Sequence, residues 1–557
     1  MYHFTIFIFI LSMSQYILVV SNAPDYVCPM KTPISIGEED ERYNSKPFVN
    51  GAKVLLHGEV SEWSGEYQDV TSPIIDKKTS ARSVIGKIAI MDETSVLTVS
   101  ENAKDAWKNG NGEWPKMSAE DRVQAMLNLI QQLKKKREEI IEILMWEICK
   151  NVEDATAEFD RTIGFMEATI NTYRGMNREG LWRTVNGVMA AIRRSAIGIM
   201  LCLGPFNYPF NETYAALIPA LLVGNIVIMK IPMVGGLAHI LTLEIFASAL
   251  PKGVMSFISG SGRSTMGPLM RSGVIDVFSF IGSSKAADAI IKQHPNPHRL
   301  KLFLQLEGKN LGIVLSDADI NTAVSQILLG STSFNGQRCT AIKLIFLHKS
   351  VVGEFLPLFS KQVSSLPAGL PWQQGVLITP LPEHNKISFL EGLISDAVAK
   401  GAKVVNEREG GGEVYGALMK PAILFPVTAG MRLWEEEQFG PVIPIAQYED
   451  IQEVYDFLSK SPHGLQAAVF TSSPEKAGSV VDNLSTAVGR ININTQCARS
   501  PDVYPFSARK SSGLGTMSVS EALKTFSIEV VVATKQNEAN EIIAKNLVSH
   551  SVFLENK

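Results

Sequence analysis

Gly204-Pro205-Phe206-Asn207-Tyr208-Pro209 ends an apolar, strand-like run and opens a region in which short buried strands alternate with helices. Further strands are predicted at residues 226–230, 254–259 and 277–280. Alternation of this kind is typical of a parallel sheet that is covered by helices. The sequence therefore predicts an α/β fold around an open parallel sheet.

Several of these strands bring glycine, serine or lysine to the same edge of the predicted sheet. Lys230 ends one strand, Gly260-Ser261-Gly262 follows the next, and Gly282-Ser283-Ser284 follows a third. Open α/β sheets bind nucleotides at this edge. The pair Gly260 and Gly262 is weak evidence alone, because the next glycine, Gly267, is not at the Rossmann spacing. The succession of loops is what indicates a nucleotide site.

Further along the chain, Gly336-Gln337-Arg338-Cys339-Thr340 places a cysteine between a glycine and small residues, with Lys343 four positions later. Neighbouring cations favour the thiolate, the nucleophilic form of cysteine. The alternative is a buried structural cysteine. Gly336 and Arg338 count against that alternative, because core strands rarely place a glycine and an arginine beside a residue that they bury. Cys339 is therefore the candidate nucleophile.

Size and composition describe an ordinary globular protein of more than one domain. The chain has 557 residues, which suits two or three domains. Its net charge of −4 offers no basic surface for nucleic acid, so no such partner is expected. The cysteines are few and scattered, so we predict free thiols and neither a disulfide framework nor a metal site. They are Cys28, Cys149, Cys202, Cys339 and Cys497.

The first residues are predicted to form a signal peptide over residues 1–23. Residues 4–20 are mostly apolar and end in Ser21-Asn22-Ala23, a pattern of small residues typical of a cleavage site. The run has no Lys or Arg before it and approaches spanning length, so an uncleaved anchor is the alternative. We expect entry into the secretory route, and onward transport to an organelle stays open. A cytoplasmic location is the alternative. After cleavage no stable membrane span is expected.

Residues 24–45 are polar and are predicted to be an extension before the first domain. Ser118 and Asp121 then form a capping box for a helix that is predicted to continue through residues 134–139. A second helix is predicted over residues 152–173. Two strand-like runs, 188–193 and 196–203, are close enough together to predict a hairpin.

Four motifs together resemble the aldehyde dehydrogenase superfamily over residues 46–535. They are Pro205-Phe206-Asn207-Tyr208-Pro209, Phe280-Ile281-Gly282-Ser283, Gly336-Gln337-Arg338-Cys339 and Glu436-Glu437-Gln438-Phe439-Gly440-Pro441-Val442. The resemblance implies a Rossmann-type nucleotide-binding domain (46–185 and 204–307), an α/β catalytic domain (308–490) and a β oligomerisation element (186–203 and 491–535). A tail, 536–557, has no predicted role.

The resemblance also implies a chemistry. A thiolate at Cys339 adds to an aldehyde, and the Asn207 side chain with the Cys339 backbone N–H stabilises the oxyanion. Hydride transfer to a nicotinamide then leaves a thioester. By resemblance, the cofactor contacts are Lys230, Gly262, Gly282, Ser283, Glu437 and Phe439. NADP is favoured, with NAD left open, because Met233 stands where NAD-preferring members have a glutamate that repels the 2′-phosphate.

Within the superfamily the chain is most similar to the non-phosphorylating, NADP-dependent glyceraldehyde-3-phosphate dehydrogenases. That group binds the substrate phosphate with arginines and a tyrosine, and guanidinium suits phosphate because it binds in bidentate fashion. The matching residues in this chain are Arg161, Tyr208, Arg338 and Arg499. The implied substrate is a small phosphorylated aldehyde.

One block departs from the family. Its Glu-Leu-Gly-Gly-Lys appears as Gln305-Leu306-Glu307-Gly308-Lys309, so an amide replaces the base that activates water to hydrolyse the thioester. An amide cannot accept a proton at neutral pH. Three alternatives stay open: Glu307 substitutes as the base, a thiol such as coenzyme A takes the acyl group, or the protein binds without turnover.

The last predicted strand, residues 526–533, is apolar and rich in β-branched residues. Left unpaired, such an edge invites aggregation. Pairing with a second subunit would protect it, so we expect a homo-oligomer, either a dimer or a tetramer.

Overall fold

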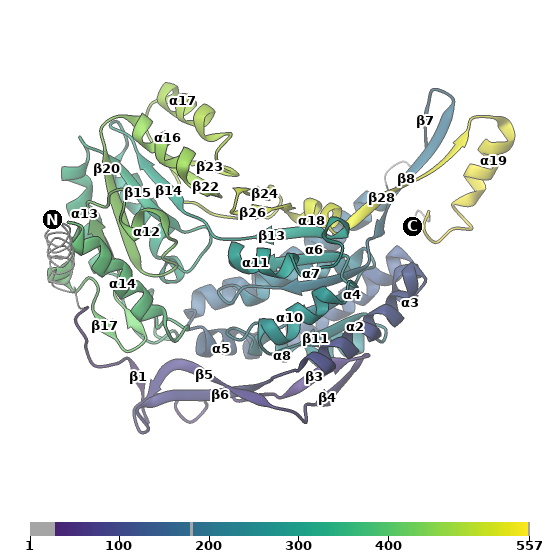
Figure 1. Cartoon of the computed structure of the whole chain (residues 1–557), viewed down its shortest axis with the longest axis horizontal. Coiled ribbons are helices and arrows are strands. Elements are labelled where there is room, and N and C mark those ends of the chain that lie inside the picture. The colour runs from purple at the N-terminus through teal and green to yellow at the C-terminus, as the bar shows by residue number, and fades with distance from the viewer. Residues whose placement is uncertain (1–27, 179–181, 555–557) are drawn as a thin grey trace, which may run out of the picture.

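The computed structural model describes residues 28–178 and 182–554, so the predicted signal peptide lies outside the described residues. Figure 1 shows an elongated molecule with two large helix-flanked sheets side by side and a small sheet projecting at one end. None of the helices within the described ranges is long and apolar enough to cross a membrane.

The first large sheet has eight strands and a central parallel part. Its spatial order is β26 (Gly513–Leu514), β13 (Lys301–Gln305), β12 (Val277–Ile281), β9 (Ile199–Leu203), β10 (Ile226–Lys230), β11 (Met255–Ile258), β3 (Lys53–Leu56) and β4 (Glu59–Glu62). The five strands from β13 to β11 are parallel. Every residue of β10 is buried, as expected for a parallel strand covered on both faces.

The strand order of this sheet reverses beside β9. The chain runs from β9 outward through β10 and β11, then returns to the other side of β9 with β12 and β13. Such a reversal opens a crevice at the carboxyl ends of the two neighbouring strands, where open α/β sheets bind ligands. The residues after β9 and β12 are Gly204 to Asn207 and Gly282-Ser283, so the predicted nucleotide edge coincides with this point.

The second large sheet has seven strands. Its order is β16 (Lys403–Val404), β19 (Ala422–Phe425), β20 (Val442–Tyr448), β15 (Ile342–His348), β14 (Asn310–Val314), β22 (Gln466–Phe470) and β23 (Arg490–Ile493). A separate sheet of four strands, ordered β1 (Ser35–Ile36), β5 (Tyr67–Asp76), β6 (Ala81–Ala89) and β2 (Val49–Gly51), lies along one side of the molecule (Figure 1).

Helices cover both large sheets (Figure 1). Around the first are α2 (Glu93–Trp107), α4 (Ala119–Lys135), α5 (Arg137–Glu147), α6 (Val152–Arg178), α7 (Pro209–Leu222), α8 (Leu237–Ile240), α9 (Leu243–Ala249), α10 (Gly262–Arg271), α11 (Ser284–Ile291) and α18 (Val519–Thr525). Around the second are α12 (Ile320–Thr332), α13 (Val352–Ser364), α14 (Lys386–Ala399), α16 (Ile451–Lys460) and α17 (Pro474–Leu484).

The predicted capping box of α4 is confirmed in one half: the Ser118 hydroxyl accepts a hydrogen bond from the backbone N–H of Asp121, but the Asp121 carboxylate accepts from the Ser118 hydroxyl rather than from its backbone N–H. The prediction that this helix continues through residues 134–139 is wrong. It ends at Lys135, and α5 begins at Arg137. The two helices bury different faces: α4 buries one amphipathic stripe, whereas most residues of α5 from Ile140 onward are buried. A straight helix could not present both faces to the core.

The predicted hairpin of residues 188–193 and 196–203 is also wrong. β8 (Val188–Ala196) lies in a three-stranded sheet between β7 (Trp182–Val185) and β28 (Ser527–Lys535), whereas β9 is in the middle of the first large sheet. The boundary of the oligomerisation element at residue 203 therefore needs correction. The reason is burial: four of the five residues of β9 are buried, which suits a strand covered on both faces, whereas β8 mixes buried and exposed residues.

Both ends of the described chain pack onto the fold. In the segment predicted as a polar extension, β1 pairs with β5 and Cys28 is fully buried. In the tail, α19 (Glu538–Leu547) follows β28, and Leu554 packs on Ala191 of β8 together with Trp182, Val532 and Leu547. Residues 24–45 and 536–557 therefore both contain parts of the folded protein.

Candidate active site

A short turn presents Cys339 between α12 and β15. Phe334 and Asn335 have φ values of 47° and 56°, and Gly336 has 71°. A Cβ on Gly336 would come within 2.8 Å of the Ser331 carbonyl and 2.9 Å of the Gly440 carbonyl, so only glycine fits. The glycine that marked this motif in the sequence is thus needed for the turn that exposes the cysteine.

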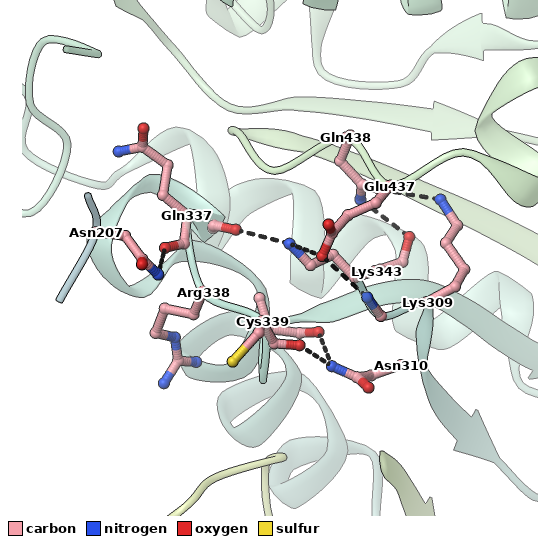
Figure 2. Close-up of polar contacts among 12 residues, drawn as sticks. Asn207, Lys309, Asn310, Gln337, Arg338, Cys339, Lys343, Glu437 and Gln438 are labelled. Carbon is pink, nitrogen blue, oxygen red and sulfur yellow. Dashed lines mark hydrogen bonds and ion pairs between the residues drawn. The ribbon is translucent and has the colours of Figure 1, made fainter. Parts of the chain in front are cut away.

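Buried hydrogen bonds fix the backbone on both sides of the cysteine (Figure 2). Asn310 Nδ2 donates to the carbonyls of Cys339 and Ala341, at 2.6 and 2.8 Å. Lys343 Nζ donates to the Gly336 carbonyl at 3.1 Å and lies 3.3 Å from Glu437 Oε1. The thiol is therefore held on a rigid segment.

The predicted oxyanion donors lie in the same pocket as the thiol. Asn207 is buried at the carboxyl end of β9, and its Nδ2 donates to the Gln337 carbonyl at 2.7 Å. Within the described residues, the backbone N–H of Cys339 donates to no acceptor. An amide group with a second N–H and a free backbone N–H are the donors that an oxyanion beside Cys339 requires.

A buried ion pair supports the segment that carries Asn207. Lys150 and Glu158 are both fully shielded and pair with each other. Glu158 Oε1 also accepts hydrogen bonds from the backbone N–H groups of Phe210 and Asn211, at 3.0 and 3.1 Å, so it caps the first turn of α7. The Lys150 ammonium lies 3.4 Å from the centre of the Tyr208 ring. Sequence reasoning missed this pair.

The prediction that the surroundings favour a thiolate at Cys339 is wrong for the ligand-free protein. Burial raises the pKa of this thiol to about 12, and the carboxylates of Glu212 and Glu437 act in the same direction. The positive charges of Lys343 and Arg499 lower the pKa, but by less than burial and the two carboxylates raise it. Arg338 instead turns to the carbonyls of Leu329 and Gly330. The free protein therefore holds a neutral thiol at neutral pH.

The departure at Gln305 is visible in the structure. Gln305 ends β13, is 9% exposed and lies in the same pocket as Cys339, and its Nε2 has no hydrogen-bond partner among the described residues. Glu307 lines the pocket too, but its Oε2 accepts a hydrogen bond from the backbone N–H of Ser284 at 2.8 Å. The candidate substitute base is thus engaged at the start of α11.

One pocket of about 830 Å³ brings the predicted site residues together. Every predicted site residue except Gly262 lines it. They are Cys339, Asn207, Gln305 and Glu307; Lys230, Gly282, Ser283, Glu437 and Phe439; and Arg161, Tyr208, Arg338 and Arg499. Met233 lines it as well, whereas Gly262 is the first residue of α10 and is not among the lining residues.

Two acids that sequence reasoning missed pair with these arginines: Glu212, which lines the pocket, and Asp502, which is not among the lining residues. Arg161 Nε and Nη2 donate to Asp502 at 2.9 and 2.6 Å, and Arg499 pairs with Glu212. Glu212 follows Tyr208 by four residues at the start of a helix, which is a spacing that could have revealed it. Asp502 lies three residues after Arg499.

Comparisons with known proteins agree with this geometry. Residues 65–532 match the aldehyde dehydrogenase family. The NADP-dependent glyceraldehyde-3-phosphate dehydrogenase of Streptococcus equinus is 32% identical over 463 residues, 81% of this chain and 92% of that protein. The Arabidopsis thaliana protein of the same name is 30% identical over 483 residues, 84% of this chain and 94% of its own.

A solved structure is also similar. The crystal structure of the NADP-dependent glyceraldehyde-3-phosphate dehydrogenase from Bacillus halodurans, complexed with NADP, superposes with a TM-score of 0.79 and 31% identity. The similarity covers 87% of this chain and 100% of that one. Motifs, pocket and comparisons together lead to one conclusion: this chain belongs to the aldehyde dehydrogenase family.

Proposed function

We propose that the protein oxidises glyceraldehyde 3-phosphate with NADP, through a thiohemiacetal and a thioester on Cys339 and without inorganic phosphate. The observation that carries the proposal is the single pocket in which Cys339 and Asn207 lie together with three arginines and Tyr208. Guanidinium groups suit a phosphate ester, and a thiol beside oxyanion donors suits an aldehyde. The names of the similar proteins support the same substrate and cofactor.

The cofactor end of the pocket fits a phosphorylated dinucleotide. Lys230 is 5% exposed, and burial lowers its pKa to about 8. Its ammonium has no hydrogen-bond or ion-pair partner among the described residues, so it is a donor available to a ligand in the pocket. Lys230 would contact the adenosine ribose, Ser283 the pyrophosphate, and Glu437 with Phe439 the nicotinamide ribose. No carboxylate at Met233 repels a 2′-phosphate. Once bound, NADP supplies the hydride acceptor.

The chain's own groups perform the acylation half of the reaction. Asn207 Nδ2 and the Cys339 N–H stabilise the oxyanion that forms when sulfur adds to the aldehyde carbon. The Cys339 thiol must lose its proton before it adds, and its raised pKa makes that step unfavourable until substrate and cofactor bind. The positive charge of Lys343, which lies in the hydrogen-bonded network behind Cys339, favours the thiolate, as does that of Arg499.

The deacylation half lacks a general base at its usual position. Gln305 cannot take a proton from water, and such assistance is worth about 10²- to 10⁴-fold. We therefore expect slow hydrolysis of the thioester, or transfer of the acyl group to a thiol such as coenzyme A.

A rapid-mixing assay tests the proposal. Protein without residues 1–23 is mixed with glyceraldehyde 3-phosphate and NADP, and NADPH is counted per active site. We expect a burst of about one equivalent followed by slow turnover, because only the first half-reaction is complete. Added coenzyme A then tests for another acyl acceptor. Fast steady turnover would mean that another group acts as the base, and no NADPH at all would favour a binding protein without turnover.

We also infer that the protein forms a homo-oligomer through β28. This strand is at the edge of its three-stranded sheet, and Ile528 and Val531 are 57% and 59% exposed. An apolar edge strand of this kind is protected when a second subunit covers it. Sedimentation of the protein with Val531→Lys, compared with the unchanged chain, tests this: the substitution should shift the protein toward monomer.

A further inference from the structure

The arginine end of the pocket contains a carboxylate that the proposed reaction does not need. Glu212 lies one helical turn after Tyr208 on α7, and its Oε2 pairs with Nη1 of Arg499. The two side chains are only 13% and 6% exposed, so water screens the pair weakly. Arg499 is thus already engaged before any substrate arrives.

A second acid shares the same cluster. Asp502 holds Arg161 in a bidentate pair and lies 3.7 Å from Nε of Arg499. Arg338 is the guanidinium that faces neutral partners: the carbonyls of Leu329 and Gly330 and the side chain of Gln496. The two carboxylates therefore engage two of the three guanidinium groups, those of Arg161 and Arg499. A phosphate monoester carries about 1.5 to 2 negative charges at neutral pH.

We propose that Glu212 is a specificity-determining residue: its carboxylate occupies the Arg499 guanidinium that a substrate phosphate would bind, and so reduces the preference for phosphorylated aldehydes over unphosphorylated ones. The inference rests on the proposed assignment of this end of the pocket to the substrate phosphate. Nη2 of Arg499 is buried without a partner among the described residues, so the guanidinium still has one donor for an incoming anion. Glu212 has to turn away before the phosphate can bind in bidentate fashion.

The direction in which Glu212→Gln changes the affinity for phosphate distinguishes this role from a merely structural one. If Glu212 only positions Arg499, Glu212→Gln misplaces the guanidinium and weakens phosphate binding. If Glu212 competes with the phosphate, the same substitution strengthens phosphate binding, because it removes a negative charge that repels the phosphate in a shielded site.

The experiment measures inorganic phosphate binding by titration calorimetry on NADP-saturated protein, so that the cofactor's own phosphate positions are filled. KM is then measured for glyceraldehyde 3-phosphate and for glyceraldehyde. We expect Glu212→Gln to bind phosphate at least about tenfold more tightly and to lower KM for the phosphorylated aldehyde by a similar factor. KM for glyceraldehyde should change less than about twofold, because that aldehyde has no phosphate to bind Arg499.

Glu93→Gln is the matched control. It removes the same charge from a glutamate that pairs with Arg271 at the exposed surface. It should leave the affinity for phosphate and both KM values unchanged. If Glu212→Gln does not fold, as judged by its unfolding midpoint, Glu212→Ala removes the carboxylate without adding an amide.

The outcomes also separate this inference from the proposed function. Equal or weaker phosphate binding in the folded Glu212 variant overturns the inference, whatever the protein oxidises. Tighter phosphate binding without oxidation of glyceraldehyde 3-phosphate supports the inference and overturns the proposed function.

Discussion

The groups around Cys339 that would serve acylation differ from those that would serve deacylation. On the acylation side, Asn207 and the Cys339 N–H are donors on segments fixed by buried hydrogen bonds. On the proposed deacylation side, Gln305 stands where a base would be needed, and its amide nitrogen has no partner among residues 28–178 and 182–554; Glu307 accepts a hydrogen bond from the Ser284 N–H. In the proposed reaction the two half-reactions use separate groups, so one can be impaired while the other stays intact. Substitutions on each side should break or sharpen this contrast.

Restoring the base should have the largest effect. Gln305→Glu places a carboxylate in the pocket beside Cys339, and steady-state NADPH production should rise by about 10²- to 10⁴-fold while the burst stays at one equivalent. Gln305→Ala is the control, since it changes the same position without adding a base. Unchanged turnover in Gln305→Glu would show that a step other than hydrolysis limits the rate.

Removing an oxyanion donor should affect the other side. Asn207→Ala should slow the burst by about two orders of magnitude, because a donor aimed at the oxyanion stabilises the transition state rather than the bound aldehyde. Stopped-flow measurement of NADPH checks this. Asn211→Ala is a matched control, because Asn211 is a buried asparagine that hydrogen-bonds Thr162 and does not line the pocket. An equal loss in both variants would point to misfolding of α7 instead.

The ionisation of Cys339 predicts an effect that is graded with pH, about tenfold per pH unit. With its pKa raised to about 12, the thiolate fraction in the free protein grows about tenfold per pH unit up to that value. Iodoacetamide should therefore label Cys339 about a thousandfold faster at pH 10 than at pH 7. Burial raises the pKa of Cys28, Cys202 and Cys497 to about 12 as well, so selectivity comes from the pocket rather than from ionisation. A plateau below pH 9 would contradict the raised pKa.

The smallest effect is expected at Glu307. Glu307→Gln weakens the cap of α11, which is typically worth about 1 kcal/mol of stability. The unfolding midpoint should fall by about one degree, because the chain is large, while slow turnover changes little. A hundredfold loss of turnover would instead identify Glu307 as the base, and the two sides of Cys339 would then both be complete.

Sequence reasoning located the strands and loops of the first large sheet because their residues carry local signals. The apolar run of β10 and the loops after β9 and β12 were predicted, and they do lie beside one another. Residues 196–203, which contain β9, were instead predicted to form a hairpin with residues 188–193, because spacing along the chain does not say which strand pairs with which.

The site shows the same division between local and distant information. Cys339, Asn207 and the arginines were predicted from short motifs, and the fold brings them into one pocket. The ionisation of Cys339 could not be predicted from its neighbours, because burial and the carboxylates of Glu212 and Glu437 decide it. The pairing of Arg161 with Asp502 joins residues 341 positions apart, so no local pattern reports it.

The packing of Leu554 on Ala191 has a practical consequence for protein engineering. The family match ends at residue 532, inside β28, yet α19 and Leu554 cover one face of the sheet that β28 completes. A chain shortened to the family boundary would lose the end of β28 and expose Trp182 and Ala191 to water. A fusion or an affinity tag should therefore be attached after Leu554, because buried packing extends to that residue whereas the family match stops at residue 532.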